Sequence, residues 1–159
     1  MNQKIIMTKN ALLKMEKLTA AHPLVENGGL LFGRMNPRWI RIYDVSDAGI
    51  DAKRSRAGVV FDAKYLTDYT IKSLEKDLFV IGTWHSHPSF SSMLPSSTDR
   101  ETMKYIHKKF SDGYTPVFCI TKLEQSNFYY KFYSLQNGFP TILDDIHVDE
   151  EGEDLIDIR

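Results

Sequence analysis

The sequence predicts a single mixed α/β domain built around one curved β-sheet with helices packed against it. A chain of 159 residues fits one domain, and 42% hydrophobic residues are enough to form one core. Apolar runs and strictly alternating segments, both typical of strands, are interrupted by three segments in which apolar residues recur at helical spacing. No internal repeat or low-complexity linker divides the sequence.

Three helices are expected. Thr8 can cap the first, which ends at His22-Pro23 because a proline biases the preceding residue away from the helical region. Asp62 can cap the second, and the third starts near Ser96. The residues expected to face the core are Leu12, Met15 and Leu18 in the first helix, Leu66, Tyr69 and Leu74 in the second, and Met103, Ile106 and Phe110 in the third.

Six strands are expected around these helices. Residues 39–45 alternate strictly between apolar and polar, and residues 78–84 form the most continuous apolar run. The other expected strands cover residues 28–33, 59–61, 116–122 and 128–135. Residues 53–56 and 138–140 are expected to be turns, because the first segment is polar and basic and the second contains glycine and proline.

Charge is distributed unevenly along the chain. The formal net charge of -1 argues against a general binder of nucleic acids or membrane surfaces. Eight of the 21 acidic residues lie between Asp144 and Asp157, so residues 1–143 carry 19 basic and 13 acidic side chains. We predict a domain of residues 1–143 followed by an acidic C-terminal tail of residues 144–159. Either this tail is solvated, or it folds back on a basic surface or contacts a partner.

The cysteine and hydropathy patterns favour a soluble, cytoplasmic protein. Cys119 is the only cysteine and lies in an apolar run, which predicts a buried thiol and excludes a disulfide within one chain. The N-terminal residues are interrupted by lysine and asparagine, unlike a signal peptide. No apolar stretch approaches the roughly 18 residues of a transmembrane helix.

The segment with the most chemical information is GTWHSHPSFSSMLPSSTD, residues 82–99. His85 and His87 are two residues apart at the end of a strand, so both side chains point to the same side and can reach one metal ion. Asp99, at the start of the next helix, can supply a third ligand. Three such ligands leave one position of a tetrahedral zinc ion open to water, which distinguishes a catalytic zinc site from a structural one.

A catalytic zinc site also needs a general base near the water. Glu26, just before the glycine-rich strand, is the best candidate by sequence context, although its spacing from the histidines proves nothing. Ser96 could donate its hydroxyl to a developing oxyanion. Each part also has a structural interpretation: a His-x-His pair is often a surface feature, and Ser96-x-x-Asp99 fits a helix capping box.

Together, His85-Ser-His87-Pro after a strand and Ser96-x-x-Asp99 opening a helix resemble the signature of the JAMM/MPN+ metalloproteases, also called the JAB domain. The resemblance runs from about residue 8 to residue 135 and implies a fold related to the cytidine deaminases. It also implies that His85, His87 and Asp99 bind Zn²⁺, that Glu26 is the acid/base residue, and that Ser96 stabilises the tetrahedral intermediate.

The chain departs from the family pattern at one point. Eight residues separate His87 from Ser96, where the usual pattern has seven, so we expect a bulged loop that leaves the ligands in place. The compact chain looks like the small prokaryotic JAB proteins. The implied function is hydrolysis after the C-terminus of a ubiquitin-like modifier, in deconjugation or precursor maturation, as in bacterial anti-phage conjugation systems. The implied partners are a ubiquitin-like protein or its conjugate and activating- and conjugating-enzyme-like proteins.

Three other functions were weighed against this one. A non-catalytic MPN-type scaffold would lack metal ligands, whereas all the expected ligand types are present here. A deaminase would need a Pro-Cys-x-x-Cys motif, which one cysteine cannot provide. A phage-tail or cell-wall peptidase is disfavoured by the lack of a signal peptide or second hydrolase domain in this sequence.

Overall fold

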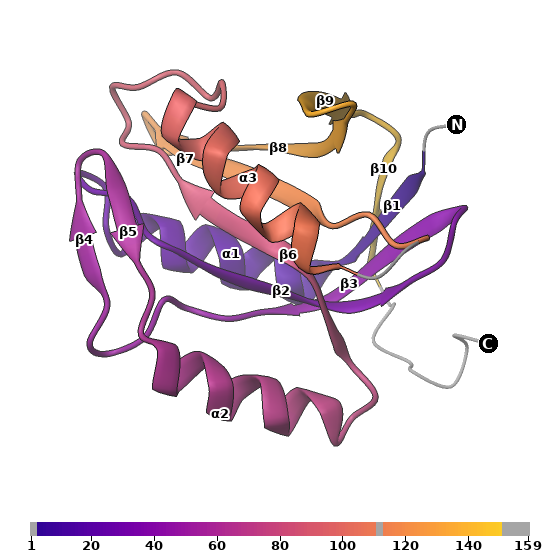
Figure 1. Cartoon of the computed structure of the whole chain (residues 1–159). Coiled ribbons are helices and arrows are strands. Elements are labelled where there is room, and N and C mark those ends of the chain that lie inside the picture. The colour runs from indigo at the N-terminus through magenta and orange to yellow at the C-terminus, as the bar shows by residue number, and fades with distance from the viewer. Residues whose placement is uncertain (1–2, 111–112, 151–159) are drawn as a thin grey trace.

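The computed structural model describes residues 3–110 and 113–150. Within these residues the chain forms an eight-stranded mixed sheet with the order β10-β1-β3-β2-β6-β7-β8-β9, a separate two-stranded hairpin of β4 and β5, and three helices (Figure 1). The prediction of a mixed sheet with helices packed on it is therefore confirmed. Its relation to the cytidine deaminases stays a prediction.

The elements follow one another closely along the chain. The strands are β1 (Lys4–Thr8), β2 (Gly28–Met35), β3 (Trp39–Val45), β4 (Lys53–Ser55), β5 (Gly58–Val60), β6 (Phe79–Ser86), β7 (Val117–Glu124), β8 (Asn127–Gln136), β9 (Phe139–Leu143) and β10 (Ile146–Asp149). The helices are α1 (Lys9–Ala20), α2 (Ala63–Leu74) and α3 (Ser97–Lys109).

The sheet separates α1 from the other two helices (Figure 1). The side chains of strand β7 alternate between the two faces of the sheet. Cys119 belongs to the main core, with Met15 of α1, whereas Phe118 and Ile120 pack with Met103 of α3. Helix α2 covers the α3 side of the sheet through the contact between Tyr69 and Phe32. Because strand side chains alternate between faces, one apolar run can serve both layers. Cys119 is fully buried, as predicted.

The helix starts agree with the capping residues expected from the sequence. The side chains of Thr8, Asp62 and Ser96 each accept a hydrogen bond from a backbone N–H in the first turn of α1, α2 and α3. One core prediction is wrong: Leu74 is 46% exposed. It is the last residue of α2 and lies beside the buried face of the helix, which contains Ser73 and, as expected, Leu66.

The structure contains four strands that the sequence did not predict. They are β1, β9 and β10 of the sheet and β4 of the hairpin. Residues 53–55 pair with 58–60 as the hairpin β4–β5, where the sequence predicted a turn. Pro140, expected in a turn, lies in β9, an edge strand in which proline removes no hydrogen bond of the interior sheet. β1 joins the sheet between β3 and β10.

The sheet continues past the predicted domain boundary at residue 143. β10 pairs in parallel with β1, so residues 146–149 of the expected acidic tail form an edge strand. Alternating Ile146 and Val148 make this pairing favourable despite the nearby acidic residues. The rest of the expected tail, residues 151–159, lies outside the described residues. No helix among the described residues is long and apolar enough to cross a membrane.

Candidate metal centre

His85 and His87 lie where β6 leaves the sheet. β6 is a central strand between β2 and β7, so its backbone is fixed on both sides. The pairing continues at its end, where the His87 N–H donates to the Thr121 carbonyl of β7 at 2.8 Å. The two side chains point to the same side, as their spacing predicted, and their Nε2 atoms are 3.2 Å apart.

Asp99 reaches the two histidines from the first turn of α3. Its Oδ1 lies 3.2 Å from His85 Nε2, and its Oδ2 lies 3.1 Å from His87 Nε2. The capping box fixes the carboxylate, because Asp99 Oδ2 also accepts from the Ser96 N–H at 2.9 Å. The structure therefore combines the two interpretations of Ser96-x-x-Asp99, since one carboxylate both caps the helix and faces the histidines.

The three side chains fit a tetrahedral zinc ion. Their ligand atoms all lie within 4.8 Å of one another. With zinc–ligand bonds of about 2.0–2.1 Å, adjacent corners of a tetrahedron are about 3.3 Å apart. The two Nε2 atoms are 3.2 Å apart, and each lies 3.1–3.2 Å from one of the two Asp99 carboxylate oxygens, which is close to this spacing. Two imidazoles and one carboxylate are also a ligand set that zinc prefers, and the fourth corner would be left for water.

The loop between His87 and Ser96 orients the second histidine. His87 Nδ1 donates to the Ser92 carbonyl at 2.5 Å, which orients the ring so that Nε2 faces Asp99 and His85. The loop is held at two further points: Lys122 Nζ donates to the Ser91 carbonyl, and Tyr133 Oη donates to the Met93 carbonyl. These anchors come from β7 and β8. They explain how a loop one residue longer than usual keeps its ligands together.

Glu26 lies in the same hollow as two of the three candidate ligands. It is 8% exposed and lines a cavity of about 120 Å³ with His85 and Asp99, which we call the Glu26 cavity. Burial raises the pKa of the Glu26 carboxyl, while the nearby histidines oppose this shift. The opposite holds for Asp99: burial disfavours its charge, but hydrogen bonds from His85 and His87 hold its pKa well below the ordinary value.

Ser96, the remaining predicted site residue, is exposed and caps α3 through its hydroxyl, which accepts from the Asp99 N–H at 3.0 Å. The comparisons with known proteins decide the family. The profile of the family described as prokaryotic homologs of the JAB domain matches residues 9–133. The chain belongs to this family. Curated proteins gave no significant match to the sequence.

The fold of this JAB domain also occurs in a solved structure. It is similar to the solution structure of protein DSY2949 from Desulfitobacterium hafniense, with a TM-score of 0.72 and 19% identity. The match covers 92% of this chain and 94% of the other. At this identity the similarity shows the fold alone.

A buried polar cluster that the sequence did not indicate fixes the position of Glu26 in the JAB domain. Asn27 is fully buried, and its amide donates to the Leu18 carbonyl and to Asp47. Arg54 of β4 donates from Nε to Asn27 Oδ1 at 2.9 Å and from Nη2 to Asp47 Oδ2 at 3.2 Å. We call Asn27, Asp47 and Arg54 the Asn27 cluster. It joins the hairpin to the segment that carries Glu26.

Backbone pairing next to Glu26 completes this arrangement. The Glu26 N–H donates to the Ser55 carbonyl of β4 at 2.8 Å. The Ser86 N–H donates to the Asn27 carbonyl at 2.8 Å, and the Asn27 N–H donates to Ser86 Oγ at 2.9 Å. A Cβ at Gly28 would lie 2.5 Å from the Trp84 carbonyl oxygen, so only glycine allows β2 to approach β6 beside His85. In the sequence, only the glycine pair after Glu26-Asn27 indicates that this segment packs closely against β6.

The hairpin and the loop after His87 meet beside the site. The guanidinium of Arg56, in the turn of the hairpin, lies over the Phe90 ring at 4.8 Å from its centre. Phe90 is 59% exposed, so the contact is formed at the surface. Residues 57–59 and Phe61 line one wall of the Glu26 cavity, and α3 lines the other. The candidate metal centre is thus bordered by the hairpin and by the loop after His87, neither of which contains one of its ligands.

Proposed function

We propose that the chain is a zinc-dependent isopeptidase or peptidase that hydrolyses the bond after the C-terminus of a ubiquitin-like modifier, in deconjugation or precursor maturation. One observation carries the proposal: His85, His87 and Asp99 bring three ligand atoms to the spacing of a zinc site, with Glu26 in the adjoining cavity. Membership of the JAB family supports it, since this is the activity that the sequence resemblance implied.

Zinc, Glu26 and Ser96 have separate roles in the proposed reaction. When bound, zinc supplies Lewis-acid chemistry: it polarises the scissile carbonyl and acidifies the attacking water. Glu26 accepts the proton of that water on its carboxylate and delivers it to the departing nitrogen. Burial raises the pKa of Glu26, which makes its carboxylate a stronger base toward the water while it can still release the proton to the nitrogen. Ser96 is the proposed oxyanion donor.

The proposed substrate is an extended tail that ends in small residues. The Glu26 cavity holds only about 120 Å³, so a bulky side chain next to the scissile bond does not fit. The β4–β5 hairpin borders this cavity and pairs only with itself among the described strands. An edge of the hairpin could therefore accept the tail by strand addition. The activating- and conjugating-type partners, the anti-phage setting and the cytoplasmic location belong to the same proposal.

The main competing function is a non-catalytic MPN-type scaffold. It predicts that the ligand set need not be kept together, whereas here the loop, the capping box and β7 all hold it in place. A phage-tail or cell-wall peptidase would use the same chemistry on a different peptide. No feature of the described residues favours it.

The test combines metal analysis with hydrolysis. The purified chain should contain about one zinc ion per molecule and should release a fluorophore joined by an amide bond to the C-terminal glycine of a bacterial ubiquitin-like protein. A chelator should abolish the release, and added zinc should restore it. A chain that holds no zinc would contradict the enzyme proposal. Zinc without hydrolysis of this probe, but with cleavage of a cell-wall peptide, would favour the competing peptidase.

A further inference from the structure

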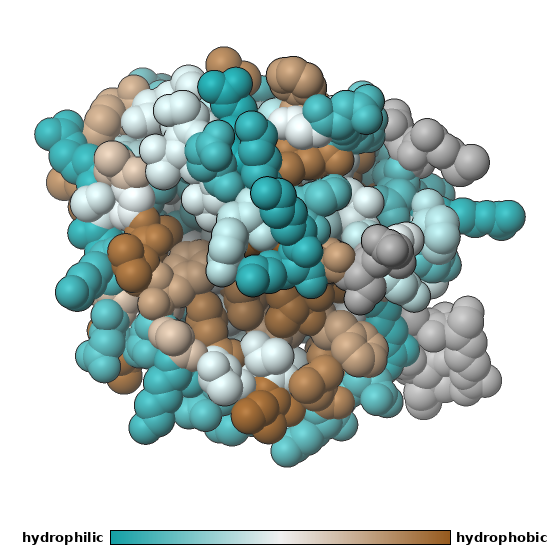
Figure 2. All heavy atoms as spheres, in the orientation of Figure 1, coloured by the Kyte–Doolittle hydropathy of each residue, from teal (hydrophilic) through white to brown (hydrophobic). Residues whose placement is uncertain are grey.

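A pocket of about 670 Å³ lies at the opposite end of β6 from the metal centre, and we call it the Trp39 pocket. Its volume falls in the range of roughly 300–1,000 Å³ that is typical of small-molecule sites. Aromatic and aliphatic side chains form most of its described lining, among them Trp39, Phe79, Ile81, Phe110 and Tyr114. Hydrophobic residues gather below α3 on the face shown in Figure 2. The proposed hydrolysis does not use this pocket.

Aromatic rings of the Trp39 pocket are open to solvent. Phe79 and Tyr114 are each 51% exposed. An exposed apolar surface in a concave site favours the binding of an apolar group, because each Å² removed from water contributes about 25 cal/mol. The rings also suit an aromatic partner, which can stack on them with an offset or meet them edge to face. The body of the ligand is therefore expected to be aromatic or branched aliphatic.

The backbone that carries Trp39 is fixed before any ligand binds. The Asn36 N–H donates to the Trp39 carbonyl at 2.9 Å, and the Trp39 N–H donates to Asn36 Oδ1 at 2.9 Å. The N-terminal segment adds two hydrogen bonds, from Gln3 Nε2 to the Asn36 carbonyl and from the Lys4 N–H to the Arg38 carbonyl. A preformed wall lowers the entropy cost of binding, since the ligand need not order the turn between β2 and β3.

The charged side chains that line the Trp39 pocket are cationic. They are Arg34 of β2 and Lys109 of α3, and none of the described lining residues is acidic. Arg34 Nε donates to the Asp77 carbonyl at 2.9 Å, which orients the guanidinium. Lys109 Nζ lies over the Tyr105 ring at 4.9 Å from its centre. Cations from two elements thus border an apolar hollow, and hydrogen bonds from a cation to a carboxylate are stronger than those between neutral groups.

We propose that the Trp39 pocket binds a small molecule with an aromatic or branched aliphatic body and one carboxylate. The body packs against the rings of Trp39, Phe79 and Tyr114, and the carboxylate accepts hydrogen bonds from Lys109 and Arg34. Charge complementarity selects an anion, because a cationic ligand would be repelled and a neutral one would gain no ion pair.

Binding in the Trp39 pocket is independent of the proposed hydrolysis. The pocket uses residues 79–81 of β6 and the end of α3, whereas the Glu26 cavity uses residues 83–85 and the earlier turns of α3. The two hollows therefore share two elements but none of their described lining residues. A ligand of the Trp39 pocket should bind with or without zinc at the metal centre.

The test is an NMR titration of the isotope-labelled full-length chain with biphenyl-4-carboxylate as the probe. The chain has two tryptophans, so the indole N–H signal of Trp39 is followed with that of the fully buried Trp84 as an internal reference. We expect a saturable shift at Trp39, and the neutral biphenyl-4-carboxamide should bind about tenfold more weakly because it forms no ion pair. No shift at Trp39, or equal affinity for the acid and the amide, would overturn the proposal.

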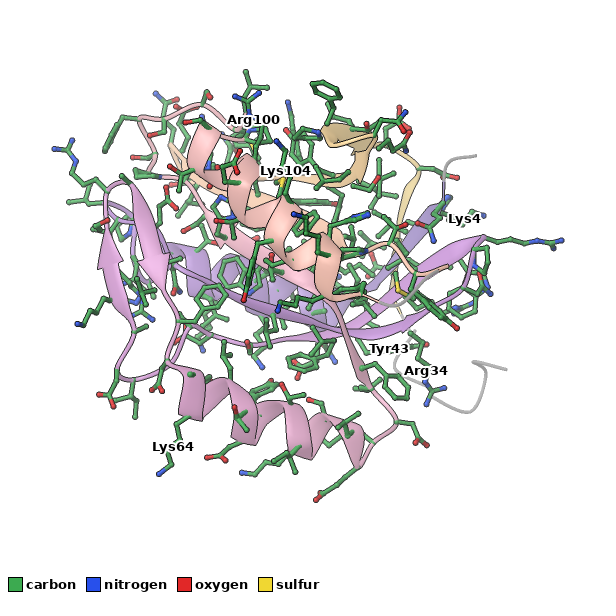
Figure 3. All side chains as sticks on the ribbon, in the orientation of Figure 1. Lys4, Arg34, Tyr43, Lys64, Arg100 and Lys104 are labelled. Carbon is green, nitrogen blue, oxygen red and sulfur yellow. The ribbon has the colours of Figure 1, made fainter. Side chains whose placement is uncertain are left out.

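Two pairs of variants locate the probe. Lys109→Glu should weaken binding of the carboxylate by about tenfold or more. Lys104→Glu is its matched control and should not change the affinity, because Lys104 lies on the same helix but pairs with Glu101 outside the pocket (Figure 3). Phe79→Ser should also weaken binding, whereas Phe139→Ser should not, since Phe139 is 69% exposed on β9 and does not line the pocket. Equal effects within either pair would place the probe elsewhere and contradict the proposal.

Two further measurements separate this site from other occupants. Because a carboxylate can also bind zinc, the titration is repeated with His85→Ala, where the shift at Trp39 should keep the same affinity. Its loss would assign the probe to the metal centre and refute the Trp39 site, while the proposed hydrolysis would stand. The second measurement uses a peptide of alternating glutamate and leucine. If this peptide shifts the Trp39 signal and the biphenyl acid does not, the pocket takes a protein partner and the small-molecule site is refuted.

Discussion

The two ends of strand β6 carry hollows of opposite character. At its C-terminal end, the small Glu26 cavity is lined by Glu26, His85 and Asp99 among other residues. At its N-terminal end lies the Trp39 pocket of about 670 Å³, more than five times as large. It is bordered by aromatic rings, among them those of Trp39 and Phe79, and by two cations, Arg34 and Lys109. Both hollows use the same helix as a wall, since α3 contributes its first turns to one and its last turn to the other.

Strand β6 and helix α3 thus form a fixed site at one end and an open surface at the other. Each functional group of the metal centre is held by a group from another segment: the Ser92 carbonyl holds His87, and the Ser96 N–H holds Asp99. At the Trp39 pocket the hydrogen bonds hold the backbone and the rim, such as the Trp39 N–H that donates to Asn36 Oδ1, while the rings of Phe79 and Tyr114 stay half exposed. Substitutions at the metal centre should therefore change chemistry in large steps, whereas those at the pocket should change only what covers it.

The largest effect is expected from His85→Ala. Removing one of three ligands leaves two protein donors, too few to retain zinc at a catalytic site. We expect zinc by elemental analysis and hydrolysis of the ubiquitin-like probe to fall below detection. His147→Ala is the matched control, because His147 is an exposed histidine that pairs with Asp145 on the edge strand β10. Equal zinc content in the two variants would show that the metal lies elsewhere.

Glu26→Gln should separate chemistry from metal binding. The amide has nearly the same shape but cannot accept the proton, so hydrolysis should fall by about 10²–10⁴-fold while zinc stays bound. Zinc content and the turnover rate of the same preparation provide the measurement. If turnover stays near that of the parent chain, another group is the base, and the buried position of Glu26 has only a structural role.

Arg54→Ala tests whether the Asn27 cluster positions Glu26. The variant removes the donor to Asn27 Oδ1 and one of the two donors to Asp47, which should cost about 1–3 kcal/mol of unfolding free energy. A displaced Glu26 should lower kcat by up to about 10²-fold with little change in KM. Arg54→Lys keeps the charge but not the two-pronged geometry, so it should recover stability more than kcat. A loss of stability with unchanged kcat would limit the cluster to a structural role.

The sequence predicted the local parts of the fold and missed pairings between distant segments. The caps at Thr8, Asp62 and Ser96 were visible because a cap and its helix are neighbours in sequence. The pairing of β1 with β10 joins segments near the two ends of the described chain, which no local pattern indicates. Strand β9 was predicted as a turn because it contains Pro140. Proline is compatible with an edge strand, but the sequence does not show which strands lie at an edge.

The candidate site divides in the same way. His85, His87 and Asp99 lie within fifteen residues of one another, and their spacing was enough to predict that they converge. Asn27 and Arg54 are 27 residues apart. Neither residue type at its position suggests a buried hydrogen bond, because asparagine and arginine are common on protein surfaces. The two residues meet only in the folded chain, where the hairpin lies beside the segment that precedes β2.

The smallest loss of stability is expected at Ser96, where two substitutions distinguish the two roles of the hydroxyl. Ser96→Ala removes the cap of α3 and should cost about 1 kcal/mol of unfolding free energy, whereas Ser96→Gly should cost only a few tenths. Neither variant has a hydroxyl. If Ser96 only holds α3 and Asp99 in place, Ser96→Gly should hydrolyse the probe faster than Ser96→Ala and almost as fast as the parent chain. An equal loss of kcat in both variants, together with the difference in stability, would instead assign the hydroxyl to the reaction and extend the chemistry of the metal centre to the surface of α3.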